Sequence, residues 1–188
     1  MIHEAVIITR NPDGGLHIVP MGYREEADHI IIAPFRPSTT LENLRRTGLA
    51  VINMTDNVAI LAGCLTGRRD WPTIPASVVD GARLEDTLAH MELEVTRVEE
   101  DEVRPRFLCS VKHRETHAPF KGFNRAQSAV IEAAILVSRL EMLPREKVDA
   151  EIGYLKIAID KTSGKRERQA WEWLMERVQS FRNQESGA

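Results

Sequence analysis

Short apolar runs separated by turn residues dominate the first 120 residues of the chain. Residues 2–9, "IHEAVIIT", and 16–22, "LHIVPMG", flank the turn signal "NPDGG" and predict a hairpin. Residues 29–35, "HIIIAPF", are apolar almost throughout and predict a buried third strand, and residues 49–54, "LAVINM", predict a fourth. A second hairpin is predicted within residues 90–113. About six hairpin-linked strands favour an antiparallel sheet or a small barrel.

Two short helices interrupt these strands. Thr39, followed three residues later by Glu42, has the spacing of a capping box, and Gly48 stands where a helix-ending glycine belongs. The next helix, "DNVAILAGCLTG", has Asp56 as its expected N-cap and Gly67 at its expected end. The first part of the chain is therefore predicted to be rich in strands, with two helices inserted.

The pattern changes to a helical period near Gly122. Residues 68–82, rich in Pro and charge, are predicted to be a surface loop, whereas the C-terminal part predicts three helices, the first with Asn124 able to cap it. Strands followed by helices indicate an α+β protein. We therefore expect a barrel domain over residues 1–121 and a helical region over residues 122–188, packed on the barrel.

Composition and charge exclude several classes of protein. The 188 residues are 43% hydrophobic and 28% charged, with a net charge of −3, which is typical of a soluble globular protein and disfavours a general nucleic-acid binder. No apolar run reaches the roughly 20 residues of a membrane span, and the first residues lack the apolar core of a signal peptide. Cys64 and Cys109 are far apart, which favours reduced thiols. We expect a cytoplasmic protein without membrane or nucleic-acid partners.

Two motifs resemble known sites only superficially. "HRETH", residues 113–117, has its Glu at the wrong position for a zinc-protease helix and lies at a strand end, so no metal site is predicted. "KTSGKRER", residues 161–168, lacks the preceding strand and the glycine spacing of a phosphate loop. The first is interpreted as a solvated strand end and the second as a turn between two helices, with nucleic-acid contact by its basic residues as a weaker alternative.

A cluster of polar residues at one strand-to-helix corner is harder to explain. A helix cap explains Thr39, but it leaves the presence of Arg36, Ser38 and Thr40 unexplained. A helix N-terminus with free N–H groups, hydroxyls and a guanidinium suits a phosphate group. From these residues alone, plain capping and phosphate binding both stay open.

Polar residues also end other predicted elements. Asn53 and Thr55 alternate along one strand and point to the same side, with Asp56 following. Gly22 ends the second strand and would allow a flat ligand to approach the backbone. We hypothesise that these ends, with Asn124 and Arg125, meet the corner around one phosphate-bearing ligand.

The order of these segments resembles a known family. "HIVPMG", "IIIAPFRPSTTLENLRRTG" and "AVINMTD" together are similar to the FMN-binding split-barrel proteins of the flavin reductase type, and more closely to the DUF447 family of archaea and of bacteria with methanopterin-linked one-carbon pathways. "PFNRAQSAVIEAAILVSRL" and "KTSGKRERQAW" resemble the C-terminal part of that family.

The resemblance implies a six-stranded antiparallel FMN-binding split β-barrel with a C-terminal helical extension, working as a homodimer with FMN near the subunit interface. It assigns three groups of residues to the cofactor. His17, Pro20, Met21 and Gly22 would lie beside the isoalloxazine ring; Arg36, Ser38, Thr39 and Thr40 would surround the phosphate and ribitol; Asn53, Thr55, Asp56, Asn124 and Arg125 would add polar contacts. Arg36-Pro37 stands where a turn with Gly is more usual in the family.

The function implied by the resemblance is that of an FMN-dependent oxidoreductase acting on an unknown small substrate, linked to methanopterin-dependent one-carbon metabolism. No catalytic side chain is predicted, because in flavin chemistry the cofactor transfers the electrons and the protein orients it. A non-catalytic flavin-binding or protein-interaction module is the alternative.

Overall fold

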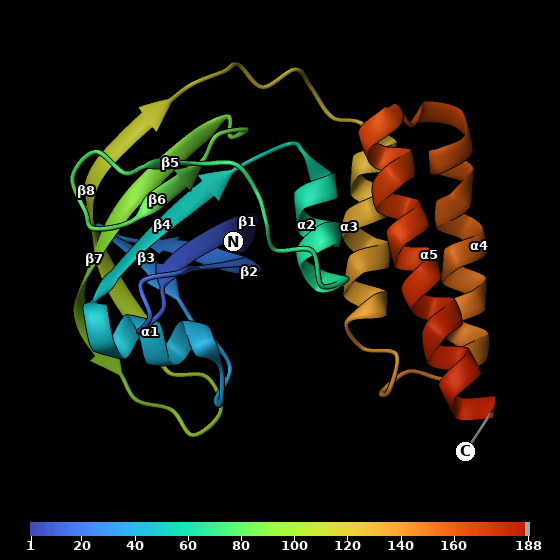
Figure 1. Cartoon of the computed structure of the whole chain (residues 1–188), viewed down its shortest axis with the longest axis horizontal. Coiled ribbons are helices and arrows are strands. Elements are labelled where there is room, and N and C mark those ends of the chain that lie inside the picture. Colours follow the sequence, from blue (N-terminus) through green and yellow to red (C-terminus); the bar gives the residue numbers. More distant parts are fainter. Residues whose placement is uncertain (187–188) are drawn as a thin grey trace. The chain divides into compact units, whose positions relative to one another are not determined.

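The computed structural model of the chain describes residues 1–186, with side chains up to residue 184, so the end of the predicted helical region lies outside the described residues. The chain forms two compact units. Residues 1–55 and 70–120 make up the barrel unit, and residues 56–69 together with those from 121 onward make up the helical unit. Figure 1 shows the strands of the first unit and the helices of the second.

Six antiparallel strands close the barrel in the order β1-β2-β3-β8-β7-β4. This confirms the predicted fold. The barrel strands are β1 (His3–Arg10), β2 (Leu16–Glu26), β3 (His29–Ile32), β4 (Leu49–Met54), β7 (Ala89–Glu99) and β8 (Arg106–Thr116). β3 ends three residues earlier than predicted, because the chain leaves the sheet at Ala33.

Alternate residues of these strands fill the barrel interior. Ile7, Ile32, Ile52, Leu93 and Phe107 have no solvent-exposed surface. Each buried side chain of this size stabilises the fold by about 1.5–3 kcal/mol relative to its exposed state. The runs of Ile and Val in the sequence are therefore the inner lining of the barrel.

A small hairpin, β5 (Thr73–Pro75) and β6 (Ala82–Leu84), lies within and just beyond the segment predicted to be a loop. The loop prediction is wrong there because strands of three residues are too short to show an alternating pattern. Leu84 is fully buried, so β6 covers part of the outer face of the barrel.

Helix α1 (Thr39–Thr47) follows β3. Its N-cap is Ser38, which has an extended backbone and accepts a hydrogen bond through Oγ from the Leu41 N–H at 3.3 Å. The predicted capping box is wrong, because starting the helix at Thr39 places Glu42 one position too late. The predicted end is confirmed: Gly48 follows the helix with a φ of 69°, in the left-handed region.

Helix α2 (Val58–Leu65) also begins one residue later than predicted. Asn57, not Asp56, is its N-cap, with Oδ1 accepting from the Ala59 N–H at 3.2 Å. Asp and Asn cap helices about equally well, so the pattern does not distinguish two such neighbours. Gly67 has a φ of 91° just after the helix, as its predicted role requires.

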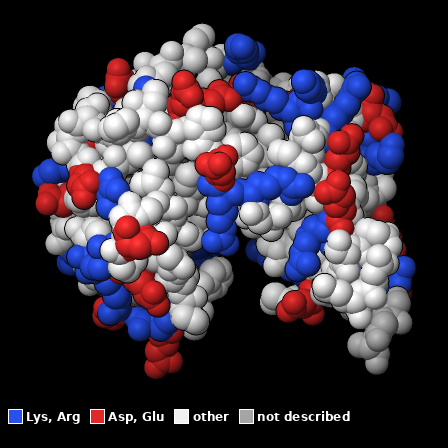
Figure 2. All heavy atoms as spheres, viewed as in Figure 1, with Lys and Arg blue, Asp and Glu red and all other residues white. Residues whose placement is uncertain are grey.

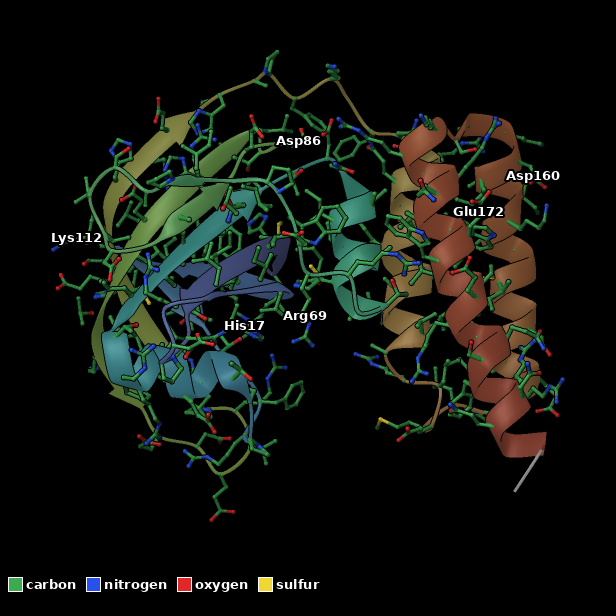
Figure 3. The ribbon with its side chains drawn as sticks, in the orientation of Figure 1. His17, Arg69, Asp86, Lys112, Asp160 and Glu172 are labelled. Atoms are coloured by element: carbon green, nitrogen blue, oxygen red, sulfur yellow. The ribbon has the colours of Figure 1, made fainter. Side chains whose placement is uncertain are left out.

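The helical unit combines α2 with α3 (Arg125–Val137), α4 (Arg145–Thr162) and α5 (Lys165–Ser186). Small residues such as Ala126, Ala129 and Ala133 let these helices approach closely, and Trp171 and Leu174 fill the space between them. Asp160 and Glu172 project away from α4 and α5 (Figure 3). Among the described residues, every helix is too short or too polar to cross a membrane.

Candidate functional site

Over part of its length, β2 has a neighbouring strand on only one side. β2 pairs with β1 along Leu16–Tyr23 but with β3 only along Tyr23–Glu26. Residues 16–22, which we call the open edge, therefore have no second strand partner within the described chain. Such an edge presents backbone N–H and C=O groups that a ligand can bind.

The segment after β3 does not extend the sheet along this edge. Beyond Ile32 the chain turns toward the β7–β8 loop, where the Arg36 N–H donates to the Val103 carbonyl at 2.9 Å. The Arg104 guanidinium donates to the Ala33 carbonyl, also at 2.9 Å. These bonds attach the segment to the β7–β8 loop.

Helix α1 then crosses one end of the barrel, as Figure 1 shows. Asn43 of α1 donates through Nδ2 to Thr9 Oγ1 at 3.0 Å and to Asn11 Oδ1 at 2.9 Å. Thr9 pairs directly with His17 in the sheet. The helix therefore lies beside the first residues of the open edge.

The N-terminus of α1 can receive an anion. The N–H groups of its first turn have no intrahelical partner, and the helix dipole favours negative charge there. Thr39 is exposed, whereas Thr40 is only 1% exposed and Ser38 Oγ is engaged in the cap. A phosphate here would therefore contact backbone N–H groups and Thr39 rather than all three hydroxyls.

Carboxylates share this end of the barrel with Arg36. Glu100 accepts from Arg36 at 3.0 Å and from Arg45 at 2.6 Å. A surface pocket there is lined by Arg36, Glu100, Asp101 and Glu102. Basic and acidic side chains are interspersed on the face of the molecule drawn in Figure 2. An incoming phosphate would have to replace Glu100 as the partner of the two guanidinium groups.

The predicted ring contacts on β2 fall on both faces of the strand. Met21 packs against the barrel core, so Pro20 and Gly22 face the other side. A Cβ atom on Gly22 would lie 2.6 Å from Ile2 Cγ2, so the close approach at this glycine is made by Ile2. His17, labelled in Figure 3, is partly buried. A flat ligand would meet this stretch along its open backbone edge.

Asn53 is fully buried and holds the barrel together. Its Nδ2 donates to the Val6 carbonyl at 3.2 Å, and its Oδ1 accepts from the Leu84 N–H at 2.7 Å. Thr55 donates to the Asp86 carbonyl at 3.1 Å. Asn53 therefore joins β4, β1 and β6, and its predicted ligand contact has no support in this geometry.

The corner and the strand end lie at opposite ends of the barrel. Arg36 pairs with Glu100, just after β7, whereas Thr55 bonds to Asp86, just before β7. β7 has 11 residues, and a strand of that length spans roughly 30 Å. Within one barrel these two groups therefore do not lie side by side, and their meeting around one ligand stays a prediction.

The remaining predicted site residues belong to the helical unit. Asn124 caps α3, as predicted, accepting through Oδ1 from the Ala126 N–H at 2.8 Å, and it donates to the Thr162 carbonyl at 3.1 Å. Arg125 is the exposed first residue of α3, and Asp56 precedes the α2 cap. Their contribution to a cofactor site stays a prediction.

A cluster of histidines and acids that was not predicted as a site lies near the C-terminal end of β4, where His90 pairs with Asn53. In the sheet, His90 pairs with Glu115 and Glu92 pairs with His113. His90 Nδ1 is 2.9 Å from His117 Nε2, and His90 Nε2 is 3.2 Å from Glu92 Oε1. The signal was present as the alternating patterns "HME" and "HRETH", which place these side chains on one face of two paired strands.

Glu92 is an ionised carboxylate without solvent exposure. Burial alone would raise its pKa, but the N–H groups of Val79, Ser77 and Val78, together with His90, outweigh burial and lower the pKa to about 2. The three backbone donors lie 2.6–2.8 Å from the carboxylate. Glu92 thereby binds the chain segment after β5 to the barrel wall.

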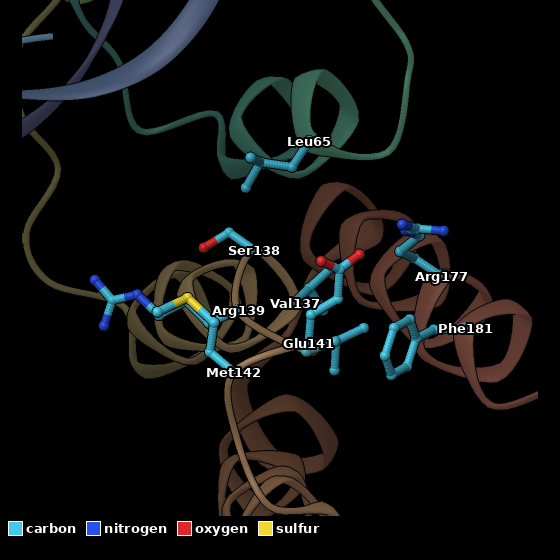
Figure 4. A pocket seen from close by; sticks show the side chains of 9 residues that line it. Leu65, Val137, Ser138, Arg139, Glu141, Met142, Arg177 and Phe181 are labelled. Carbon is cyan, nitrogen blue, oxygen red and sulfur yellow. The ribbon is translucent and has the colours of Figure 1, made fainter. Parts of the chain in front are cut away.

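The helical unit contains a separate pocket of about 250 Å³. Figure 4 shows Leu65 of α2, Arg177 and Phe181 of α5, and residues around the end of α3 at this pocket. None of the predicted cofactor residues lines it. The open edge and the α1 corner are therefore the better candidate for a cofactor.

Residues 3–118 match the family model "Protein of unknown function (DUF447) N-terminal domain", and residues 124–176 match "Protein of unknown function (DUF447)". The chain belongs to the DUF447 family. The predicted family is thus confirmed. A comparison with curated proteins found no match.

Solved structures share the fold of this DUF447 chain. An FMN-bound DUF447 protein from Methanosarcina mazei is similar over 94% of both chains, with a TM-score of 0.80 and 16% identity. Flavoredoxin from Methanosarcina acetivorans is similar over 62% of this chain and 69% of its own, with a TM-score of 0.54 and 13% identity. The styrene monooxygenase flavin reductase from Pseudomonas putida S12 is similar over 63% and 82%, with a TM-score of 0.52 and 14% identity.

Proposed function

We propose that this DUF447 chain is an FMN-binding flavoprotein and an oxidoreductase acting on a small substrate. The observation that carries the proposal is the shared fold with the FMN-bound DUF447 protein, which extends over 94% of both chains and so includes the helical extension. Flavoredoxin and a flavin reductase are similar over 62% and 63% of this chain, which supports redox chemistry on this scaffold.

The residues of the barrel unit fit an elongated ligand with one anionic end. The phosphate would bind at the N-terminus of α1, where free N–H groups, Thr39 and Arg36 are available. The ring system would lie along the open edge of β2, where the backbone offers hydrogen-bond donors and acceptors to its polar rim. FMN supplies the electron transfer when bound, and the chain orients it and controls its surroundings.

Glu100 has a specific part in this proposal. If Glu100 moved away, both Arg36 and Arg45 would be available to the phosphate. The Glu100 carboxylate would then be solvated by water, to which it is already largely exposed. The exchange of one anion for another keeps both guanidinium groups paired. This replacement of Glu100 by the phosphate predicts that FMN affinity depends on the charge of residue 100.

We also propose a homodimer. Thr55 bonds to Asp86, before β7, and Arg36 pairs with Glu100, after β7, so Thr55 would contact the same cofactor from a second copy rather than from its own barrel. The substrate class and the link to methanopterin-dependent metabolism rest on the family resemblance. A non-catalytic flavin carrier is the second candidate, favoured by the structural use of Asn53 and Ser38.

The first experiment is an absorption spectrum of the purified protein, with mass identification of any released ligand. We expect a flavin spectrum, or its appearance when FMN is added to stripped protein. Anaerobic addition of NADH or NADPH then separates the two candidates: an oxidoreductase reduces its flavin, whereas a carrier does not. Protein that neither holds nor takes up FMN contradicts the proposal.

A titration of stripped protein with FMN locates the phosphate. The double variant Arg36→Ala/Ser38→Ala should lose roughly 2–5 kcal/mol of binding free energy, because it removes a charge-assisted hydrogen bond and disturbs the helix N-terminus. Arg97→Ala is the matched control, since Arg97 is an exposed arginine at the same end of the barrel and pairs with Glu99. Equal affinity of the double variant and the control would exclude the corner as the phosphate site.

A further inference from the structure

We propose that the barrel unit carries a binding site for a divalent transition metal, formed by His90, His113 and Glu115. One potential ligand atom from each of these side chains lies within 4.8 Å of those of the other two. The residues come from neighbouring positions of β7 and β8, where His90 pairs with Glu115 and His113 is two residues away on the same face. Two rigid, hydrogen-bonded strands therefore hold the three groups together.

One ring nitrogen of this cluster has no hydrogen-bond partner among the described residues. His113 Nε2 is buried and has no hydrogen-bond partner in the described structure, and it lies 3.6 Å from Glu115 Oε2. A buried polar atom without a partner is costly, so such atoms point to a group that completes the site. A metal ion bound between His113 and Glu115 would satisfy both.

His90 is held in place by a hydrogen-bond partner at each ring nitrogen. It is fully buried, and each of its ring nitrogens faces a partner: Nδ1 faces His117 Nε2 at 2.9 Å, and Nε2 faces Glu92 Oε1 at 3.2 Å. A metal ion would replace one of these partners: at Nδ1 it would displace His117 and leave Nε2 to donate to Glu92, and at Nε2 it would displace Glu92 and leave Nδ1 with His117. This secondary hydrogen bond fixes the ring and strengthens it as a ligand.

The ligand set indicates the class of metal. Two imidazoles and one carboxylate suit zinc and related first-row ions rather than calcium or magnesium, which prefer oxygen ligands. Zinc bonds of about 2.0–2.2 Å bring ligand atoms to about 3.3 Å from each other, so the ligand atoms, now within 4.8 Å of one another, must close by up to about 1.5 Å. Glu115 is largely exposed and free to make that movement. Three protein ligands leave a fourth position for water.

Within one chain, this site lies away from the α1 corner proposed for the FMN phosphate. Residues 113 and 115 lie near the C-terminal end of β8, whereas the α1 corner contacts the loop before β8 begins. The metal test therefore gives its result whether or not the chain binds FMN.

The test measures Zn²⁺ binding to the full chain, produced without a histidine tag and stripped with a chelator. Equilibrium dialysis followed by elemental analysis should give one Zn²⁺ per chain. His113→Ala and Glu115→Gln should each weaken binding by at least about tenfold. Both side chains are partly exposed, so these variants should fold. His29→Ala, which removes a barrel histidine outside the cluster, should bind as the unaltered chain does.

Substitution of Co²⁺ provides a second readout. The unaltered chain should show the visible absorption bands of low-coordinate Co²⁺ with nitrogen ligands, and His113→Ala should lose them. The proposal is overturned if the unaltered chain binds no Zn²⁺, or if His113→Ala and Glu115→Gln bind Zn²⁺ as tightly as His29→Ala does.

Discussion

The two ends of the barrel use charge in opposite ways. At the α1 end, Glu100 pairs with Arg36 and Arg45 in an exposed network that water and other anions can reach. Toward the opposite end of β7, Glu92 is fully buried and bound by three backbone N–H groups and His90. The first arrangement can exchange partners at little cost, whereas the second is part of the fold.

Energetics support this division. Exposed ion pairs contribute about 0–1 kcal/mol to stability. A buried carboxylate that loses its donors costs several times more, because neither it nor the donors can turn to water. Ligand binding is therefore expected where charges are replaceable, and loss of stability where they are not.

The largest stability loss should follow from Glu92→Gln. The amide keeps one acceptor oxygen but places an NH₂ group against backbone donors, so we expect a loss of about 3 kcal/mol in the free energy of unfolding. Urea denaturation at pH 7, in chelator, measures it. Glu94→Gln is the control, because Glu94 lies on the same strand but is exposed and pairs with Lys112.

The effect of Glu92 should also depend on pH. Its folded pKa of about 2 lies below the ordinary value of 4.5, so the carboxylate stabilises the fold fully above about pH 4.5. That contribution is lost as the pH falls toward 2. The difference in stability between the unaltered chain and Glu92→Gln should therefore shrink between pH 5 and about pH 3. A difference that stays constant over this range would contradict the account of Glu92.

Asn53→Ala should have the next largest effect. It leaves the Leu84 N–H and the Val6 carbonyl without their side-chain partner, which should cost about 2 kcal/mol. Thermal unfolding measures the loss, and the exposed Thr96→Ala in β7 serves as control. Unchanged stability would show that β6 does not depend on this bond.

A smaller effect tests the start of α1. Ser38→Ala should lose about 1 kcal/mol of stability, because it removes the cap on the Leu41 N–H. Thr39→Ala should change stability by less than about 0.5 kcal/mol, since Thr39 is the exposed first residue of the helix. Chemical denaturation of the two variants compares them directly, and the reverse order would restore Thr39 as the cap.

Glu100→Gln should change ligand binding more than stability. Its two ion pairs are exposed, so the free energy of unfolding should change by less than about 1 kcal/mol. FMN should bind severalfold more tightly, because the amide competes less well than the carboxylate for Arg36 and Arg45. Weaker FMN binding to this variant would contradict the proposed exchange of anions.

The fold was predictable because long, regular apolar patterns determine it. The barrel strands and the Gly48 and Gly67 helix ends are visible in the sequence, since each depends on residues a few positions apart. The exact position of a helix cap is not visible in the sequence. Ser38 and Thr39 both suit the cap position, and the backbone conformation after Pro37 decides between them. The hairpin of β5 and β6 is stabilised by Asn53, some 30 residues away, so no local pattern reveals it.

The site was harder to predict than the fold. Polar side chains at strand ends have the same appearance in the sequence whether they meet a ligand or the backbone, and Asn53 meets the backbone. The open edge of β2 is a property of strand pairing and cannot be seen in residues 16–22 themselves. The cluster of His90, Glu92 and His113 depends on the register between β7 and β8, which only the folded chain displays.

The central claim is that FMN binds along the open edge of β2 with its phosphate at the start of α1. Amide hydrogen exchange of the stripped chain, with and without FMN, tests it most directly. We predict slower exchange in residues 16–22 and 39–41 when FMN is added, with little change in residues 89–99 of β7. FMN binding that leaves residues 16–22 and 39–41 unprotected and slows exchange elsewhere would contradict the account.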